Sequence, residues 1–450
     1  MAKELVKRGT HILGIKDMAG LCKPYAAEKL VKALRNEVGV PVHFHTHDTS
    51  GTQAAAIVKA TEAQVDIADM AIASMSGLTS QPNLNSVVAT LRDHPRNTGL
   101  ALGSLNKIAD YFENVRQFYY PFESDMKSGT AEVYYHEMPG GQYTNLQQQA
   151  QSLGLYDRWD EIKREYRAVN FLFGDIVKVT PSSKIVGDMA LFLVSNRLKA
   201  EDVIEKGKHI SFPESVVQFF EGHIGFPPGG FDKKLQQVIL KGRKPLAKRA
   251  GALLKPVDLK KLREKLAGEF GSDIDPRDTL SSALYPKVFE EFASARKKYG
   301  DVAPIPTRNF LFGMDIDEEI MIEIEAGKTL IVKLIAVSEP AKDGTRKVYF
   351  ELNGTPRDVI IRDKKVKTTA KERAKADANN LHHLGATMPG LVSEIKISKG
   401  SEVKRGDVLI VLEAMKMQVN VAAPRDGVIK NVPVAKGDVV ETDDLLVVFE

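Results

Sequence analysis

The sequence has little of what several protein classes require. Its 450 residues contain a single cysteine, Cys22, which excludes an intrachain disulfide and favours a reducing compartment. No stretch approaches the ~18 consecutive apolar residues of a membrane span, and the first residues contain no signal-peptide core. The formal charge is only +4, without a basic cluster. We therefore expect no membrane or nucleic-acid partner, and a cytoplasmic location, or the mitochondrial matrix if the source is eukaryotic.

What is present indicates a globular protein with several domains. Hydrophobic residues make up 43% and charged residues 27% of the chain. Short apolar runs alternate with amphipathic patterns in the first 95 residues, which indicates βα units and a parallel sheet. The predicted strands are 11–16, 41–48 and 65–72, and the predicted helices are 24–36, 51–63 and 84–91. We expect a helical extension over 96–285, a small mixed α+β domain over 286–362, a linker over 363–380 and a last domain over 381–450.

The last domain contains an internal repeat. Residues 399–413 match residues 436–450 at a constant offset of 37, as in Gly400 and Gly437. Two similar halves with alternating apolar residues predict a pseudo-twofold β-sandwich. Between the halves, Lys416 stands in the sequence AMKM near an expected tight turn, where its amine would point into solvent.

The repeat and its AMKM segment resemble the biotinyl domain of biotin-dependent carboxylases. This resemblance implies that biotin is attached covalently to Lys416 and that a biotin protein ligase recognises the folded turn. A lipoyl domain is the nearest alternative in fold, and the methionines on both sides of Lys416 favour biotin.

A second motif, HTH, lies at the end of the predicted strand 41–48. Side chains two residues apart on a strand share a face, so His45 and His47 point the same way, and His43 shares their parity. Two imidazoles at this spacing can bind one divalent cation, although an isolated pattern of this kind also fits core histidines. The C-terminal end of a strand before a βα loop is where barrel enzymes place catalytic groups.

Lys16 ends the preceding predicted strand. A buried lysine readily loses its proton, and the neutral amine can add carbon dioxide to form an anionic carbamate. The segments IKDMAG and HFHTHD together resemble the carboxyltransferase domain of the pyruvate carboxylase family. This resemblance implies that carboxylated Lys16, His45 and His47 are metal ligands. Manganese and zinc both suit this set.

The segment VTPSSK (179–184) has two interpretations. By itself it is a polar turn, or a helix N-terminus capped by Thr180 or Ser182. In the family that the chain resembles, it lines the biotin and pyruvate site. By this resemblance, Thr180 passes the proton between pyruvate and biotin, while Ser183 and Lys184 hold the ureido ring of biotin.

The order of these segments resembles the C-terminal part of a single-chain pyruvate carboxylase. The implied fold is α/β: the C-terminal part of a (β/α)8 barrel with a helical extension, a small α+β domain and an all-β biotinyl domain. Residues 1–285 would be the carboxyltransferase part, with the partial barrel in 1–95, and 286–362 the tetramerisation and allosteric domain. The implied activity is carboxyl transfer from carboxybiotin to pyruvate, giving oxaloacetate, in a homotetramer for which acetyl-CoA is a possible effector.

The barrel is incomplete in this sequence. About three βα units precede the helical extension, whereas a (β/α)8 barrel needs ~200 residues or more. The family's aspartate metal ligand, its arginine and glutamine for substrate, and an ATP-grasp domain are not recognisable here. We therefore expect a fragment with little or no activity alone. Two alternatives stay open: an oxaloacetate decarboxylase α-subunit or transcarboxylase, and a noncatalytic biotin carrier and oligomerisation fragment.

Overall fold

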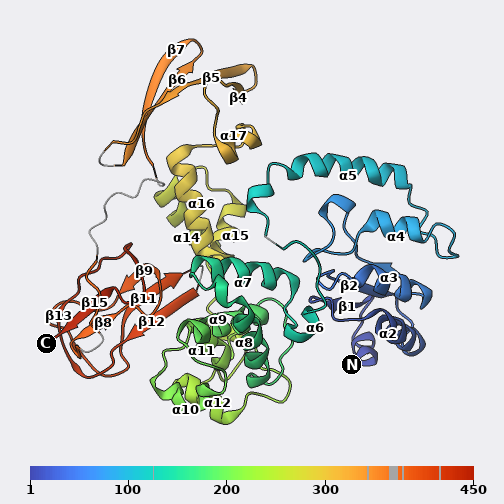
Figure 1. The fold of residues 1–450 in the computed structure, drawn as a ribbon, viewed down its shortest axis with the longest axis horizontal. Helices are drawn as coiled ribbons and strands as arrows, with labels where there is room; N and C mark the ends of the chain where they lie inside the picture. Colours follow the sequence, from blue (N-terminus) through green and yellow to red (C-terminus); the bar gives the residue numbers. More distant parts are fainter. Residues whose placement is uncertain (125, 342–343, 364–372, 378–379, 415–416) are drawn as a thin grey trace. The chain divides into compact units, whose positions relative to one another are not determined.

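The computed structural model describes residues 1–124, 126–341, 344–363, 373–377, 380–414 and 417–450 (Figure 1). It divides into two compact units, one formed by Met1–Ala252 with Arg373–Glu450 and the other by Leu253–Glu372. In the described part of the chain, no helix combines the length and apolar character that crossing a membrane requires.

The N-terminal region contains the predicted parallel sheet. Its three strands, β1 (Leu13–Asp17), β2 (Val42–Thr46) and β3 (Ile67–Ala68), lie in the order β1-β2-β3. The helices between and around them are α1 (Ala2–Lys7), α2 (Pro24–Glu37), α3 (Gln53–Glu62), η1 (Ala73–Met75), α4 (Leu84–Thr90) and α5 (Leu102–Arg116). The third strand is much shorter than the predicted 65–72, because the chain leaves the sheet after Asp69 and the amide of Ala71 donates to Pro82 instead.

Alternation along β2 separates the buried side chains from the histidines. Val42, Phe44 and Thr46 are buried, while His43 and His45 on the opposite face are half-buried. Val42 and Phe44 pack with apolar residues of α2 and α3, the covering helices of a βα unit. The apolar set therefore fixes the register that turns the histidines away from the core.

The helical extension is organised around one buried helix, α9 (Ser182–Ser195). Every residue from Ile185 to Val194 is buried, as expected for a helix that is apolar on all sides. Helices α7, α8 and α11 pack against it. The other elements of this region are η2 (Tyr120–Phe122), α6 (Val133–His136), α7 (Gly140–Ser152), η3 (Tyr156–Arg158), α8 (Trp159–Leu172), α10 (Asp202–Lys206), η4 (Gly207–His209), α11 (Glu214–Glu221), α12 (Lys233–Leu240) and α13 (Ala250–Leu253).

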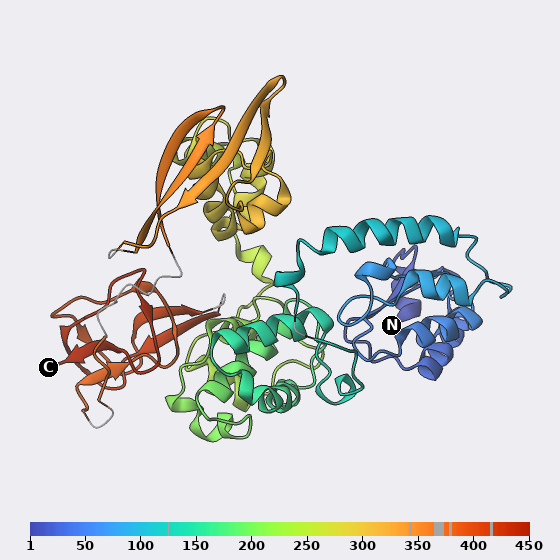
Figure 2. The same cartoon turned by 45° about the horizontal axis from the view of Figure 1, so that its top comes forward.

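The second unit combines a helical group with an antiparallel sheet. Its helices are α14 (Leu259–Phe270), α15 (Pro276–Leu284), α16 (Pro286–Tyr299) and α17 (Thr307–Phe312). Its strands are β4 (Glu319–Glu325), β5 (Lys328–Val337), β6 (Thr345–Leu352) and β7 (Thr355–Arg362), paired in sequence order. Figure 2 shows these strands as long, twisted hairpins.

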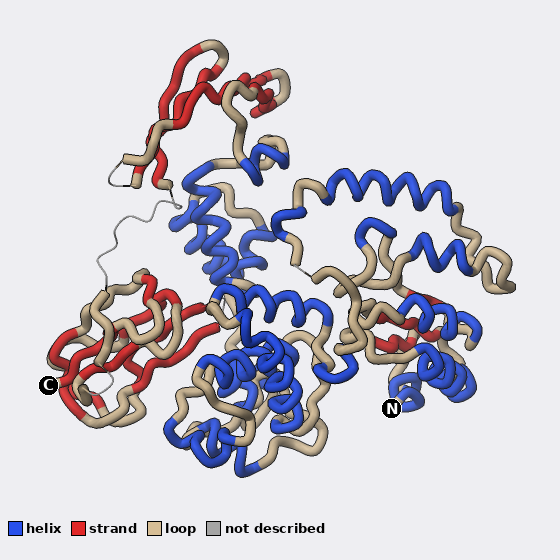
Figure 3. Tube along the Cα trace, in the orientation of Figure 1, coloured by secondary structure: helices blue, strands red, loops and turns tan. Residues whose placement is uncertain are grey.

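The C-terminal domain is all-β and consists of two four-stranded sheets (Figure 3). Its strands are β8 (His383–Gly385), β9 (Gly390–Ile395), β10 (Glu402–Val403), β11 (Val408–Ala414), β12 (Met417–Ala422), β13 (Gly427–Asn431), β14 (Val439–Val440) and β15 (Leu445–Phe449). The 37-residue offset relates β9 to β13, β10 to β14 and β11 to β15. One sheet has the order β14-β9-β11-β12 and the other β10-β13-β15-β8, so each half gives strands to both sheets. The predicted pseudo-twofold sandwich is confirmed.

Candidate functional site

Lys16 and His45 lie side by side at the carboxyl ends of β1 and β2. They are direct register partners in the parallel ladder, so their side chains leave the same face of the sheet. Lys16 is exposed, whereas the sequence interpretation assumed a buried lysine. Its exposure follows from its strand, because β1 lies at the edge of the described three-stranded sheet.

The imidazoles of His45 and His47 face each other. Their Nε2 atoms are 3.3 Å apart, and the rings meet edge to face. His45 Nδ1 lies 2.7 Å from one carboxylate oxygen of Asp69, and His47 Nδ1 lies 2.6 Å from the carbonyl oxygen of Thr79. Because both of these partners accept hydrogen bonds, each histidine carries its proton on Nδ1 and leaves the Nε2 lone pair directed toward the other ring.

This arrangement fits a metal ion. Two lone pairs facing each other at this distance repel unless a cation or proton lies between them. Two imidazole nitrogens bound tetrahedrally at ~2.0–2.1 Å would stand about 3.3 Å apart, as His45 and His47 do. Elsewhere in the described residues, as here, no three His, Cys, Asp or Glu side chains gather in a metal-binding group. The histidine pair therefore needs a ligand of another kind, and the predicted carbamate on Lys16 would supply one.

The surroundings favour neutral imidazole at His47 and an ionised carboxyl at Asp69. Burial lowers the pKa of His47, and the nearby His45 and Lys16 lower it further, against the opposing effect of the Thr79 carbonyl. Partial burial alone would raise the pKa of Asp69, but hydrogen bonds from His43 and His45 outweigh it and lower the pKa. Neutral imidazole oriented by a carboxylate is the usual form of a metal-ligating histidine.

A partly buried polar network connects the ends of β1 and β2. The Asp17 carboxylate accepts hydrogen bonds from the amides of Leu21 and Cys22 and from the hydroxyl of Thr46. Oγ1 of Thr46 also lies 3.0 Å from Oε1 of Gln53 at the start of α3. The network connects the β1–α2 turn to the end of β2. Lys16 and His45 therefore lie on a sheet edge that hydrogen bonds hold in place, and not on loops.

Asp69 and Thr79 are residues of the candidate site that the sequence did not predict. Asp69 has a weak signal, because it is an acidic residue within the third predicted strand, 65–72, next to the strand that contains HTH. Thr79 contributes only its main-chain carbonyl, which no side-chain pattern reveals.

The segment VTPSSK forms the entry into α9. Thr180 is exposed in the turn before the helix, and Ser182 is the first helical residue. Oγ of Ser182 lies 2.6 Å from the carbonyl oxygens of both Val177 and Val179, and its single proton is donated to one of them, so the hydroxyl holds the entry turn rather than capping the helix. Ser183 is buried, and its carbonyl accepts a bond from the Tyr166 hydroxyl.

Lys184 is held by a carboxylate that lies one turn further along α9. Its Nζ is 2.5 Å from Oδ2 of Asp188, and the hydroxyl of Ser215 donates to the same oxygen at 2.7 Å. Asp188 is fully buried, and its other oxygen has no hydrogen-bond partner in the described structure. Burial raises the pKa of Asp188, while Lys184 and Ser215 oppose the rise. Lys416, the predicted biotinylation site, lies outside the described residues.

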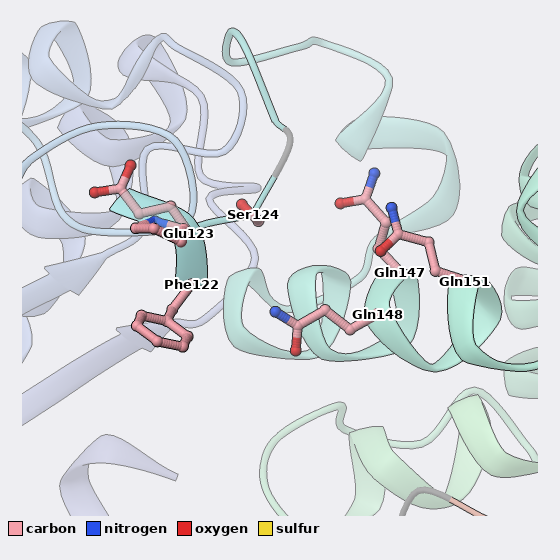
Figure 4. A pocket seen from close by; sticks show the side chains of 7 residues that line it. Phe122, Glu123, Ser124, Gln147, Gln148 and Gln151 are labelled. Carbon is pink, nitrogen blue, oxygen red and sulfur yellow. The ribbon is translucent and has the colours of Figure 1, made fainter. Parts of the chain in front are cut away.

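A cavity of ≈ 530 Å³ lies apart from these residues (Figure 4). Figure 4 shows three glutamines of α7 on one side and the segment around Glu123 and Ser124 on the other. Its lining residues are Pro121, Phe122, Glu123, Ser124, Gln147, Gln148 and Gln151. This lining includes none of the predicted site residues, so the cavity is not the candidate site.

Three family matches together span most of the chain. Residues 1–112 match the HMGL-like family, residues 133–333 a conserved carboxylase domain, and residues 382–449 the domain of biotin-requiring enzymes. Among curated proteins, the chain is 51% identical to the pyruvate carboxylase of Bacillus subtilis over 94% of its own length. Its identity to pyruvate carboxylase 1 of Caenorhabditis elegans is 46%, again over 94% of the chain.

Solved structures give the same result. The complete multifunctional pyruvate carboxylase from Rhizobium etli is 46% identical, covers 100% of this chain and superposes with a TM-score of 0.73. The carboxyl transferase domain of that protein, solved with pyruvate and biocytin, is 48% identical over 81% of this chain, with a TM-score of 0.75. The chain covers 37% of the Bacillus subtilis relative and 41% of the complete Rhizobium etli chain. It corresponds to the C-terminal region of pyruvate carboxylases, a family of biotin-dependent carboxylases.

Proposed function

We propose that this chain transfers a carboxyl group from carboxybiotin to pyruvate, giving oxaloacetate, as the C-terminal part of a pyruvate carboxylase. The observation that supports this most directly is the pair of Nε2 atoms of His45 and His47, 3.3 Å apart beside Lys16, in a chain whose residues 382–449 match biotin-requiring enzymes. A polarising metal ion and a covalent carrier are the two components that such a transfer needs.

The proposed division of labour follows the predicted domains. Residues 1–285 hold the carboxyltransferase site, with the partial barrel in 1–95 and the helical extension in 96–285. Residues 286–362 mediate tetramerisation and regulation, 363–380 form a linker, and 381–450 present biotin on Lys416. Proposed partners are a biotin protein ligase, further copies in a homotetramer and acetyl-CoA as effector, in the cytoplasm or the mitochondrial matrix.

His45, His47 and carboxylated Lys16 would hold the metal, which is zinc or manganese. When bound, it would polarise the pyruvate carbonyl as a Lewis acid. Asp69 and the Thr79 carbonyl accept the hydrogen bonds from Nδ1 that orient the two imidazoles. Thr180, exposed at the entry to α9, moves the proton between the pyruvate methyl group and biotin. Ser183 and Lys184 hold the ureido ring.

The test supplies the upstream part of the enzyme from a relative. The chain is joined to the whole upstream part of a relative, its ATP-dependent biotin-carboxylating domain included, and oxaloacetate formation from pyruvate, bicarbonate and ATP is measured alongside biotin content. The joined protein should turn over, T180A should lose at least a hundredfold in kcat, and T180S should keep part of it, because serine also has a hydroxyl. K416R should abolish biotinylation. A fully active T180A protein would disprove the assigned role, and a biotinylated but inactive wild-type protein would disprove the transfer.

A noncatalytic carrier and oligomerisation fragment is the second candidate. It is favoured by a C-terminal domain with both half-repeats in place. It predicts biotinylation of the 450-residue chain without turnover. An oxaloacetate decarboxylase α-subunit or transcarboxylase is less favoured, because the curated relatives named above are pyruvate carboxylases.

A further inference from the structure

The first turn of α7 lies directly against the candidate metal site. The amide of Gly140 donates to the carbonyl of Met18 at 3.0 Å, just beyond β1. A Cβ atom added to Gly140 would stand 2.8 Å from the Thr79 carbonyl oxygen and 3.0 Å from Nδ1 of His47. These are the two atoms that make the 2.6 Å hydrogen bond described above. Nonbonded carbon contacts are normally ~3.5–4.0 Å, so there is no room for a methyl group here.

We infer that Gly140 is a positioning residue that keeps His47 in its Nδ1-protonated form. The missing side chain lets α7 close over the hydrogen bond between His47 and Thr79. That bond directs the Nε2 lone pair of His47 toward His45. Gly140 belongs to the segment MPGGQ (138–142), to which the proposed chemistry assigns no role.

The same helix end extends this positioning to α9. A Cβ atom added to Gly187 of α9 would overlap Nε2 of Gln142, two residues after Gly140. Gly187 lies one turn after Ser183 and three residues after Lys184. One turn of α7 therefore contacts both the metal-site histidine and the helix that contains the proposed biotin-binding residues. Glycine at both contacts lets the three elements approach more closely than side chains would allow.

Gly141 provides a matched control. It is the next residue of α7, it is exposed, and a Cβ atom added there meets no atom within 4 Å. G140A and G141A make the same chemical change in the same helical turn, with a similar small gain in helix propensity. Any difference between them therefore reports the contact with His47 and Thr79.

The test measures the His47 tautomer in the full chain labelled with ¹⁵N-histidine. Long-range ¹H–¹⁵N correlations distinguish Nδ1-protonated from Nε2-protonated imidazole, and H47Q identifies the His47 signal. Wild-type protein and G141A should show Nδ1–H, and G140A should lose that form. An unchanged Nδ1–H tautomer in G140A overturns the inference, as does an Nε2–H tautomer in the wild-type protein. If G140A does not fold while G141A does, that difference establishes the close approach at Gly140. The inference then stands or falls on whether His47 in the wild-type protein is protonated on Nδ1.

The functional consequence rests on the proposed metal role of His47, and a second measurement keeps the two claims apart. Cobalt(II) titration should show at least tenfold weaker binding to G140A than to G141A, the usual scale for loss of an orienting partner. If wild-type protein binds no cobalt but the tautomer changes as expected, the proposed metal centre fails and the inference about Gly140 stands. Equal cobalt affinity of G140A and G141A would overturn the claim that Gly140 supports metal binding.

Discussion

Single residues in this chain show how burial decides which charge state is tolerated. His136 is 3% exposed, and its Nδ1 accepts a hydrogen bond from the amide of Met138, so its proton lies on Nε2. That Nε2 has no hydrogen-bond partner in the described structure. Burial lowers the pKa of His136 from 6.5 to about 4, because a second proton would place an unpaired charge in the core.

This shift predicts acid sensitivity. Between pH 6.5 and about 4, His136 binds a proton in the unfolded chain but not in the folded chain. The free energy of unfolding should therefore fall as pH falls. The effect is about 3 kcal/mol at most. H136N keeps an acceptor for the Met138 amide and should flatten this dependence in urea unfolding at pH 7, 5.5 and 4.5. H94N is the control, because half-buried His94 accepts the same kind of bond from the Arg96 amide. Equal slopes for wild type and H136N would refute the assignment.

The pair Lys184 and Asp188 predicts the opposite pH dependence. Replacing Lys184 by methionine leaves a buried carboxylate with Ser215 as its remaining partner. Breaking a fully buried pair from one side costs roughly 3–5 kcal/mol, and the cost should be lower here because the Lys184 side chain is 39% exposed. In K184M the pKa of Asp188 should rise further above its unfolded value. The loss of stability relative to wild type should then be small near pH 4 and grow as pH rises toward 7. In this range the unfolded chain releases the Asp188 proton, whereas the folded chain keeps it.

The double variant K184M/D188N is the control for this prediction. It removes both charges, so its stability relative to wild type should vary little between pH 5 and pH 7. Guanidinium unfolding at these two pH values measures both variants. A K184M protein that is destabilised equally at both would show that the buried carboxylate is not the cause.

At the scale of elements, the turn between β1 and α2 supports the sheet edge that contains the candidate metal site. Gly20 has φ +70°, and a Cβ atom there would overlap the carbonyl oxygen of His47. G20A should therefore cost the ~1–2 kcal/mol of a left-handed conformation plus a steric overlap. Gly9 has φ +93° with nothing within 4 Å of an added Cβ, so G9A isolates the first contribution. We expect G20A to be at least 2 kcal/mol less stable than G9A in thermal unfolding, and comparable values would contradict the overlap.

Elements defined by local pattern were predictable, and those defined by distant partners were not. Alternation around the HTH motif placed His45 and His47 on one face, and the 37-residue repeat predicted both halves of the last domain. The early end of β3 was missed, because it depends on a bond between Ala71 and Pro82 rather than on apolar periodicity. The partners that orient the imidazoles, Asp69 and Thr79, were missed for a similar reason, because their positions depend on where β3 ends and on the path of the loop that follows it.

At the scale of the whole molecule, the family resemblance suggested roles for residues that the hydrophobic and polar pattern of the sequence could not suggest. No periodicity distinguishes Lys184 from other surface lysines, and the buried Asp188 that holds it lies on a helix whose burial was not predicted residue by residue. The exposure of Lys16 is a property of the sheet, because an edge strand has no neighbour to cover it. Side-chain environment is thus set by assembly of the full fold, which a local motif does not contain.

The sheet of the second unit predicts self-association. Every residue of β7 is exposed, and the apolar side chains there include Ile360, which is 69% exposed. Met321 on β4 is 70% exposed. An exposed apolar sheet favours association with another surface. We expect the chain to form oligomers in analytical ultracentrifugation, and I360K to weaken them at least tenfold by placing a charge in the contact. T355K adds the same charge at the first residue of β7 without removing apolar surface, and should associate like wild type. A monomeric wild-type chain, or equal association of I360K and T355K, would exclude this strand as the contact.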